Sequence, residues 1–221
     1  MKYVLLVVVV SVMICSTVVF LNYRNFSTET VGARIAPYAE QRKALLVIDV
    51  QNDLTDKSRG SAINQPQAVR LIENVNRITG MADKTDLTVI YIRQAFKQGT
   101  IMHYLAGELL SDGSTGVEID SRLKVINDLV FNKELMDAFS NSDFETFLKK
   151  EKINHLILTG MDAEACVDRT LKGASNRGYK TTVISDAIAT KDDARLQKKI
   201  ADFKKAATSV ITTDELLKLK I

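Results

Sequence analysis

The chain has few of the residues that mark small disulfide-bonded or disordered proteins. It contains two cysteines, two prolines and no tryptophan among 221 residues. Two cysteines cannot form the framework of several disulfides that holds a small secreted domain together. So few prolines, with only ten glycines, exclude collagen-like and proline-rich disordered chains. With 46% hydrophobic and 26% charged residues, the composition fits one folded domain with an appendage.

A large excess of one charge is also missing. The net charge is +3, and four basic and two acidic residues lie within positions 1–42, which leaves +1 for residues 43–221. Nucleic-acid backbones are bound by clustered cationic charge. The near-neutral composition of residues 43–221 therefore predicts that nucleic acid is not a partner.

A single long hydrophobic run lies at the N-terminus, where no residue from Tyr3 to Leu21 is charged. As a helix this run is about 28 Å long, close to the ~30 Å thickness of a bilayer's hydrocarbon core. We therefore predict a single-pass membrane anchor at 1–22, a polar linker at 23–42 and a folded domain at 43–221. The run is long for a signal peptide and no A-x-A cleavage site follows it, but secretion after signal cleavage remains the alternative. Basic residues flank the run about equally, so the side of the membrane is not predicted.

Short apolar segments alternate with helical patterns after residue 43. This alternation predicts a three-layer α/β/α domain around a six-stranded, mainly parallel sheet. Ser142 and Glu145 have the spacing of a capping box, which places a helix start there. The expected strands are 44–50, 87–92, 128–131, 153–159, 179–185 and 209–212, and the expected helices include 66–81, 101–110, 192–206 and 214–220.

Three reactive side chains follow separate strands of this predicted sheet. Asp49 ends the first strand, Lys133 follows the third, and Cys166 comes shortly after the fourth, in the first turn of a helix. The carboxyl ends of parallel strands share one edge of the sheet, where α/β proteins place their sites. A helix N-terminus and a nearby ammonium both stabilise a thiolate, so the pattern predicts a Cys166 of lowered pKa. With Asp49 as acid and base, the three groups would support acyl transfer.

Three sequence blocks resemble the isochorismatase-like cysteine hydrolases, a family that includes nicotinamidases and N-carbamoylsarcosine amidases. The first block is Leu46–Leu54, the second is Lys133 with Ala138-Phe139 and Ser142, and the third is Leu156–Val167. The resemblance covers residues 43–212. It implies a homo-oligomer, no cofactor, and a catalytic set of Asp49, Lys133 and Cys166.

The resemblance also implies a cis peptide bond between Met161 and Asp162. This bond would turn the backbone N–H groups of Asp162 and Cys166 toward a developing oxyanion. Asp162 and Glu164 stand where many family members have uncharged or smaller residues. Their carboxylates either oppose an anionic substrate and raise the pKa of Cys166, or point away and cap the helix; we favour capping.

The substrate contacts are less defined in the sequence. Gln51, in the first of the three blocks, is one candidate. Phe96, His103 and Tyr104 are the others, since the irregular segment 94–127 borders the substrate in the family. Nicotinamidases hold a metal through an Asp and two closely spaced His, whereas His103 and His155 are far apart here. We therefore predict no metal, and expect His155 to be structural.

The leading hypothesis is a membrane-tethered cysteine hydrolase that cleaves an amide or related C–N bond of a small molecule. True isochorismatases often lack the cysteine, so a vinyl-ether hydrolase is a lesser alternative. A non-catalytic binding or scaffold protein that keeps the fold is the alternative from a different functional class.

Overall fold

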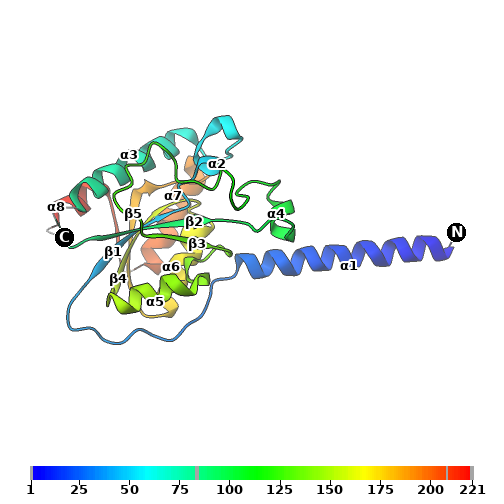
Figure 1. Cartoon of the computed structure of the whole chain (residues 1–221), viewed down its shortest axis with the longest axis horizontal. Helices are drawn as coiled ribbons and strands as arrows, with labels where there is room; N and C mark the ends of the chain where they lie inside the picture. The colour runs from blue at the N-terminus through cyan, green and yellow to red at the C-terminus, as the bar shows by residue number, and fades with distance from the viewer. Residues whose placement is uncertain (1, 83–84, 208, 220–221) are drawn as a thin grey trace.

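A six-stranded parallel sheet forms the centre of the protein (Figure 1). The structure, a computed structural model, describes residues 2–82, 85–207 and 209–219. The strand order β3-β2-β1-β4-β5-β6 places the two central strands, β1 and β4, side by side. The strands are β1 (Lys43–Ile48), β2 (Thr88–Gln94), β3 (Val130–Lys133), β4 (His155–Gly160), β5 (Lys180–Ile188) and β6 (Ser209–Ile211).

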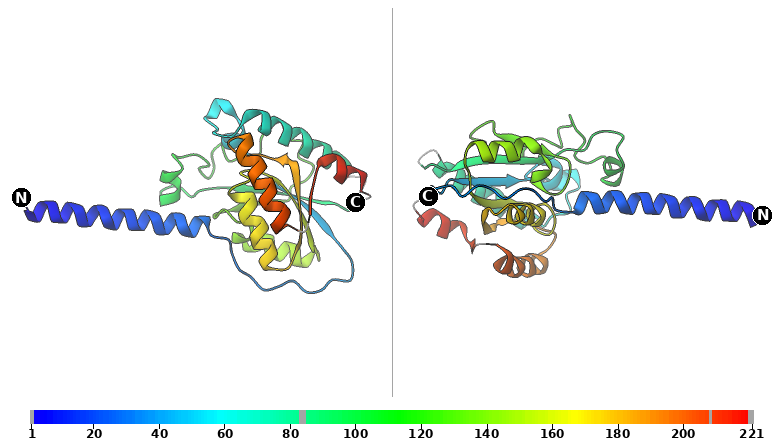
Figure 2. Two further views of the ribbon diagram at one scale, coloured as in Figure 1. Left: turned by 180° about the vertical axis from the view of Figure 1, so that it is seen from behind. Right: turned by 90° about the horizontal axis from the view of Figure 1, so that it is seen from below.

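Helices cover both faces of the sheet, which confirms the predicted α/β/α layers. Helices α3 (Gln65–Ala82) and α8 (Thr213–Lys218) pack on one face. On the other face lie α5 (Ser142–Lys150), α6 (Cys166–Asn176) and α7 (Asp193–Ala206). Figure 2 shows α6 and α7 next to each other in both views.

Alternate side chains of β1 point to opposite faces of the sheet and so belong to two different cores. Leu45 and Val47 belong to the core under α3, whereas Leu46 and Ile48 belong to the core under α5 and α6. All four side chains are buried. A strand that is apolar at every position is what a parallel sheet covered on both faces requires.

Two local predictions were wrong. Helix α4 (Ile101–Leu105) stops well before Leu110, because Gly107, Glu108 and Leu110 all have positive φ angles. Helix α5 is not started by a Ser142 capping box, since the Asn141 side chain is the N-cap and accepts from the Phe144 N–H at 3.0 Å.

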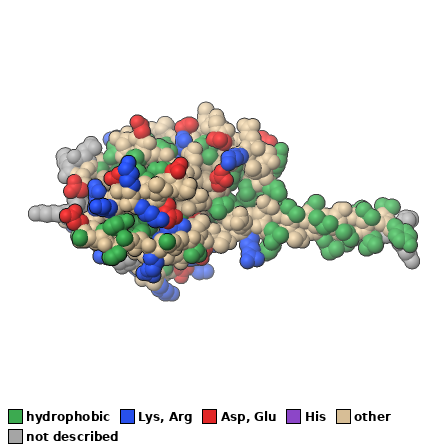
Figure 3. Space-filling model, turned by 60° about the horizontal axis from the view of Figure 1, so that its bottom comes forward, with side chains coloured by type: hydrophobic (Ala, Val, Ile, Leu, Met, Phe, Trp, Pro, Cys, Tyr) green, Lys and Arg blue, Asp and Glu red, His purple; other side chains and the backbone are tan. Residues whose placement is uncertain are grey.

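Helix α1 (Lys2–Ser27) extends beyond the predicted span and projects away from the sheet (Figure 1). The segment of α1 from Tyr3 to Ser27 is, by length and composition, long and apolar enough to cross a membrane. Hydrophobic side chains cover the projecting part (Figure 3).

The predicted linker is bound to the domain over part of its length. The backbone N–H and the hydroxyl of Thr30 both donate to Asp137, at 2.8 and 2.6 Å. Farther along, the Ile35 N–H donates to the carbonyl of Arg177 at 2.8 Å, and Ile35 packs against the core. Residues 30–35 therefore act as a strap, defined here as the segment that follows α1 along the domain surface.

Glycine is required where β1 and β4 approach the carboxyl edge. Gly160 has a φ of +117°, and a Cβ there would lie 2.0 Å from the carbonyl oxygen of Ile48. That oxygen also accepts from the Met161 N–H at 2.9 Å, so neither backbone can move aside freely.

We predict that Gly160→Ala lowers the free energy of unfolding by about 3 kcal/mol or more, measured by urea denaturation. The control is Gly80→Ala within α3, where a Cβ meets no atom within 4 Å and which should gain up to ~1 kcal/mol. A Gly160→Ala protein as stable as the wild type would show that the close approach of the two strands is not required.

Candidate active site

The structure brings Asp49, Lys133 and Cys166 together at the carboxyl edge of the sheet. Asp49 directly follows β1, Lys133 is the last residue of β3, and Cys166 is the first residue of α6, which follows β4. The Lys133 Nζ lies 2.9 Å from an Asp49 carboxylate oxygen and 3.3 Å from the Cys166 Sγ. Three residues far apart in the sequence thus occupy one site, at the shared carboxyl edge where the sequence analysis expects them.

The Lys133 ammonium has a partner for each of its three hydrogens. Besides Asp49 and Cys166, it donates to the Oε1 of Gln94 at 2.6 Å. The side chains of Lys133 and Asp49 are 0% and 1% exposed, so this is a fully buried ion pair. A buried charge is tolerated when its hydrogens are all bonded, and Lys133 meets that condition.

Asp49 has an unusual backbone and a buried carboxylate beside Cys166. Its φ is +53°, a value rare outside glycine, in the turn that leaves β1. Its carboxylate pairs with the Lys133 ammonium and also contacts the Cys166 thiol, a hydrogen bond that acts to lower the pKa of Asp49. The carboxylate can therefore take a proton from the neighbouring Cys166.

The protonation of the site differs from the prediction. Burial, followed by the Asp49 charge, raises the pKa of the Cys166 thiol, and the Lys133 ammonium only partly opposes this. The predicted low pKa of Cys166 is therefore wrong, because loss of solvent outweighs the helix end and the ammonium. Burial also raises the pKa of Asp49, although Lys133 opposes the shift. Burial disfavours the Lys133 ammonium, but the charges and hydrogen bonds of Asp49 and Cys166 together outweigh it, so the pKa of Lys133 is raised.

Two backbone N–H groups beside the sulfur are unused. The peptide bond between Met161 and Asp162 is cis, as the resemblance implies. The three N–H groups of residues 163–165 all donate within the turn or to Ala189. The N–H groups of Asp162 and Cys166 donate to no acceptor in residues 2–82, 85–207 and 209–219. They are the pair that the resemblance implies for an oxyanion.

The two carboxylates before Cys166 are both engaged elsewhere. An oxygen of Asp162 accepts from the Glu164 N–H at 2.9 Å and so caps the turn that leads into α6. Glu164 pairs with Arg195 at 3.2 Å. The favoured capping interpretation therefore fits Asp162, although the cap lies one turn before α6 begins.

A cavity of about 270 Å³ opens onto Cys166. Phe96 lines it, as predicted. The other three predicted substrate contacts, Gln51, His103 and Tyr104, do not line it.

These three residues have other environments. Gln51 is fully buried, and its amide bonds to the backbone of Gln94 and Val117. His103 is buried against Ser111, its Nε2 lying 2.6 Å from the hydroxyl, and Tyr104 is 65% exposed on α4. Gln51 therefore supports the site through its hydrogen bonds to Gln94, and none of the three side chains lines the cavity.

Two residues of the site were missed. Gln94, at the end of β2, lines the cavity and bonds to Lys133. Its place at a strand's carboxyl end was a usable signal. Phe26, in the last turn of α1, also lines the cavity, and no local pattern indicates this, because α1 and the site are brought together only by the fold.

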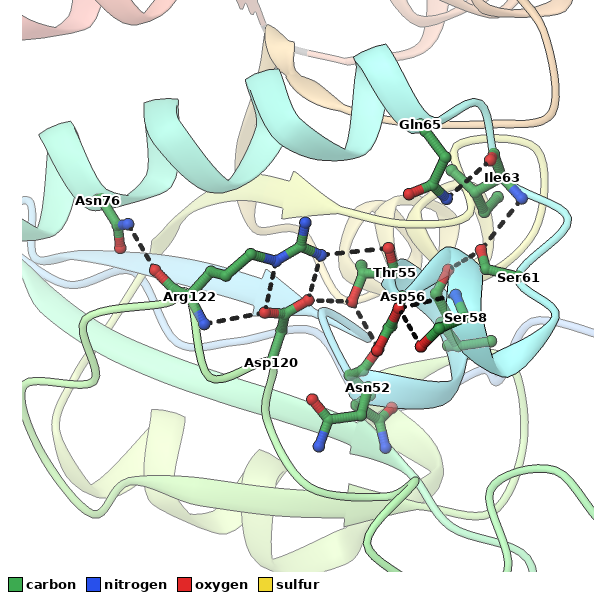
Figure 4. Close-up of polar contacts among 12 residues, drawn as sticks. Asn52, Thr55, Asp56, Ser58, Ser61, Ile63, Gln65, Asn76, Asp120 and Arg122 are labelled. Atoms are coloured by element: carbon green, nitrogen blue, oxygen red, sulfur yellow. Dashed lines mark hydrogen bonds and ion pairs between the residues drawn. The ribbon is translucent and has the colours of Figure 1, made fainter.

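A polar network joins α2 (Asn52–Thr55) and the turn after it to Asp120 and Arg122 (Figure 4). Asp120 accepts two hydrogen bonds from the guanidinium of Arg122, at 2.9 and 2.6 Å, and a third from the hydroxyl of Thr55. Thr55 closes α2, which carries Asp53 to the cavity. The network therefore holds the segment that follows Asp49.

Histidine does not contribute a metal site in the described part of the chain. There, no group of three or more His, Cys, Asp or Glu side chains could hold a metal ion. The Nε2 of His155 lies 2.8 Å from the Thr182 hydroxyl, and burial lowers the pKa of His155 to about 4. A buried neutral histidine between strands fits the predicted structural role.

The sequence of this chain matches a known protein family. The family model described as Isochorismatase domain matches residues 43–215. The chain belongs to the isochorismatase family. Its relatives include an uncharacterised isochorismatase family protein of Bacillus subtilis, 29% identical over 68% of this chain and 75% of that protein. Membership in this family makes the protein a hydrolase and favours that hypothesis over a scaffold.

Other members of the isochorismatase family have named activities or solved structures. The N-carbamoylsarcosine amidase of an Arthrobacter species is 25% identical over 80% of this chain and 70% of its own length. The isochorismatase-like hydrolase of Alkaliphilus metalliredigens superposes with a TM-score of 0.74 at 23% identity, over 80% of this chain and 98% of that one. The structural likeness shows that the fold is shared.

We predict that Asp49→Asn lowers the pKa of Cys166, because it removes the carboxylate charge that opposes the thiolate and leaves the Lys133 ammonium. The rate of iodoacetamide alkylation against pH measures this shift, in a Cys15→Ser background that leaves one thiol. An unchanged or higher alkylation pKa in Asp49→Asn would contradict the assigned electrostatics.

Proposed function

We propose that the protein hydrolyses an amide or related C–N bond of a small molecule, with Cys166 as nucleophile, Asp49 as general acid and base, and Lys133 as their electrostatic partner. The observation that carries the proposal is the buried contact of Lys133 with both Asp49 and Cys166, beside two free N–H donors and a cavity.

The first half of the reaction forms a thioester. Asp49 takes the proton of the Cys166 thiol as the sulfur attacks the carbonyl carbon, so no free thiolate has to accumulate. The N–H groups of Asp162 and Cys166 donate to the oxygen, which becomes negative as the S–C bond forms. Asp49 then returns the proton to the nitrogen, the C–N bond breaks, and ammonia or an amine leaves.

Water completes the cycle. Asp49 takes a proton from the water as its oxygen attacks the thioester carbon, and the C–S bond breaks. The proton returns to the sulfur, which restores the thiol and releases the acid. Lys133 stays protonated throughout, because its raised pKa holds the ammonium through changes in the charge of its neighbours.

Both the cysteine and the size of the cavity favour an amide substrate. Hydrolysis of a vinyl ether needs no thioester, whereas cleavage of an amide gains from a covalent intermediate. The cavity's 270 Å³ is room for about nine non-hydrogen atoms, at ~30 Å³ for each water-sized unit. A relative bears the name of an amidase of comparably small substrate, N-carbamoylsarcosine.

We also propose that α1 anchors the protein in a membrane. The helix exposes its apolar side chains on every side, and 0% of its most apolar window is buried against the domain. Such a surface is stable in lipid and costly in water.

We predict that Cys166→Ala and Asp49→Asn each lower kcat/KM by at least about 10³-fold, because the residues act as one unit. The measurement is ammonia release from a panel that includes N-carbamoylsarcosine and butanamide. Cys15→Ser, which removes the exposed thiol of α1, should keep the wild-type rate. Wild-type rates in both site variants would refute the catalytic assignment.

We predict that the full-length protein stays in the membrane fraction after alkaline carbonate extraction, because ~19 apolar residues suffice to span the hydrocarbon core. Intact mass spectrometry of the same fraction reports whether the N-terminus is retained. A soluble protein whose mass lacks residues near 1–22 would instead support the cleaved signal peptide.

A further inference from the structure

The last turn of α1 is part of the cavity wall. Phe26 is 7% exposed, lines the cavity, and packs on Phe96 with ring centroids 5.5 Å apart. The turn is held in place because the Met136 N–H donates to the Phe26 carbonyl at 3.0 Å, and the Arg169 guanidinium donates to the Ser27 carbonyl. The apolar helix and the substrate cavity are therefore one continuous structure.

This continuity fixes the depth of the cavity relative to a bilayer. From Leu21, the last residue of the apolar run, to Phe26 is five residues, or about 7.5 Å along the helix axis. The headgroup layer on each side of the hydrocarbon core is roughly 6 Å thick. Tyr23 and Arg24, both exposed, lie between the two points, and residues of these types are common at that depth. A membrane-spanning α1 thus places the Phe26 wall of the cavity at the lipid surface.

Helix α4 exposes apolar side chains beside α1. The two helices are in contact, and Figure 1 shows α4 displaced from the sheet toward the projecting helix. Tyr104, Leu105 and Leu109 are 65%, 49% and 37% exposed. Leu109 also lines the cavity, so the apolar surface runs from the cavity rim onto the side that faces the bilayer.

Most of the cavity wall is apolar. Away from the reacting groups it is formed mainly by Phe26, Leu54, Ile63, Phe96, Leu110 and Met161. Asp53 also faces it, but its charge is paired with Arg59 at 3.0 Å. Such a wall suits an uncharged hydrocarbon group next to the scissile bond.

We infer, building on the proposed amide hydrolysis, that the substrate is a primary amide with an apolar tail that partitions into the membrane. The amide lies at Cys166, and the tail leaves the small cavity past Phe26 and Leu109 toward the lipid. A tail longer than the cavity is therefore accommodated.

The competing substrate would carry a carboxylate. Lys191 is exposed and lines the cavity, so its ammonium could pair with an anionic group. Asp162 lies close enough to Lys191 for the lysine to affect the pKa of Asp162, which partly neutralises this cation. The experiment below includes a substrate that decides between the two.

The first arm measures specificity with full-length protein in phosphatidylcholine vesicles. The probes are butanamide, hexanamide, octanamide and the anionic succinamate. We expect kcat/KM to rise roughly threefold to fourfold for each added methylene, and succinamate to be the poorest substrate.

Phe26→Ala should lower the ratio of octanamide to butanamide activity by about tenfold, and Leu109→Asn should lower it without removing a buried side chain. Phe20→Ala, which alters an exposed position of α1, is the matched control and should leave the ratio unchanged.

The second arm locates α4 relative to the bilayer. Because the chain has no tryptophan, Tyr104→Trp introduces a single tryptophan whose fluorescence can be excited without that of the tyrosines. Brominated phosphatidylcholine should quench it, whereas Tyr38→Trp, near Lys180 and Asn154 at the amino ends of the strands, should not be quenched.

The outcomes separate this inference from the proposed function. A flat chain-length series, a preference for succinamate, or no quenching at position 104 in an enzyme that hydrolyses butanamide would overturn the inference alone. No hydrolysis of any probe by wild-type protein, with Cys166 unreactive to all of them, would count against both.

Discussion

The buried ion pair between Asp49 and Lys133 is the interaction on which the site depends. Removing two charges from water costs several kcal/mol for each ion, and their attraction offsets this only with good geometry and full hydrogen bonding. The three partners of Lys133 supply that geometry. They come from the ends of β1 and β2 and from the start of α6, so the pair is stable only when the central strands are assembled in the observed order.

The same burial sets the resting state of the nucleophile. A partly buried sulfur beside a carboxylate keeps its proton, and the raised pKa of Cys166 follows. This arrangement protects the thiol from adventitious oxidation, because oxidants attack the thiolate. It also makes the base indispensable, since attack on a carbonyl requires the proton to move to Asp49 as the bond forms. The unused N–H groups of Asp162 and Cys166 then meet the negative charge that develops.

Much of this could be predicted from the sequence. Apolar strands have strong patterns, so their approximate ranges and the positions of Asp49, Lys133 and Cys166 at strand ends or just beyond could be predicted without a structure. Gln94 was missed because a glutamine has no pattern of its own and its role appears only when its amide meets Lys133. The pKa of Cys166 was predicted in the wrong direction, since burial is a property of the packed domain and the sequence shows only the neighbouring helix end. Segment 94–127 was weakly predicted because positive φ angles at residues such as Glu108 and Leu110 interrupt its helical pattern.

The fold shows a role of the N-terminal helix that its sequence does not indicate. In the sequence it is an apolar run that a polar linker joins to the domain, and no residue in it indicates a part in the catalytic site. In the structure its last turn contributes Phe26 to the cavity and the strap beyond it binds Asp137 and Arg177. Helix α1 and the domain are therefore coupled by packing as well as by the chain.

The most direct test of the central claim is mass spectrometry of the protein quenched during turnover of an accepted amide. The account predicts that the peptide containing Cys166 gains the mass of the acyl group, that hydroxylamine removes it, and that Cys15 is unmodified. Sustained ammonia release with no acyl group on Cys166, under conditions that trap a thioester, would contradict the account.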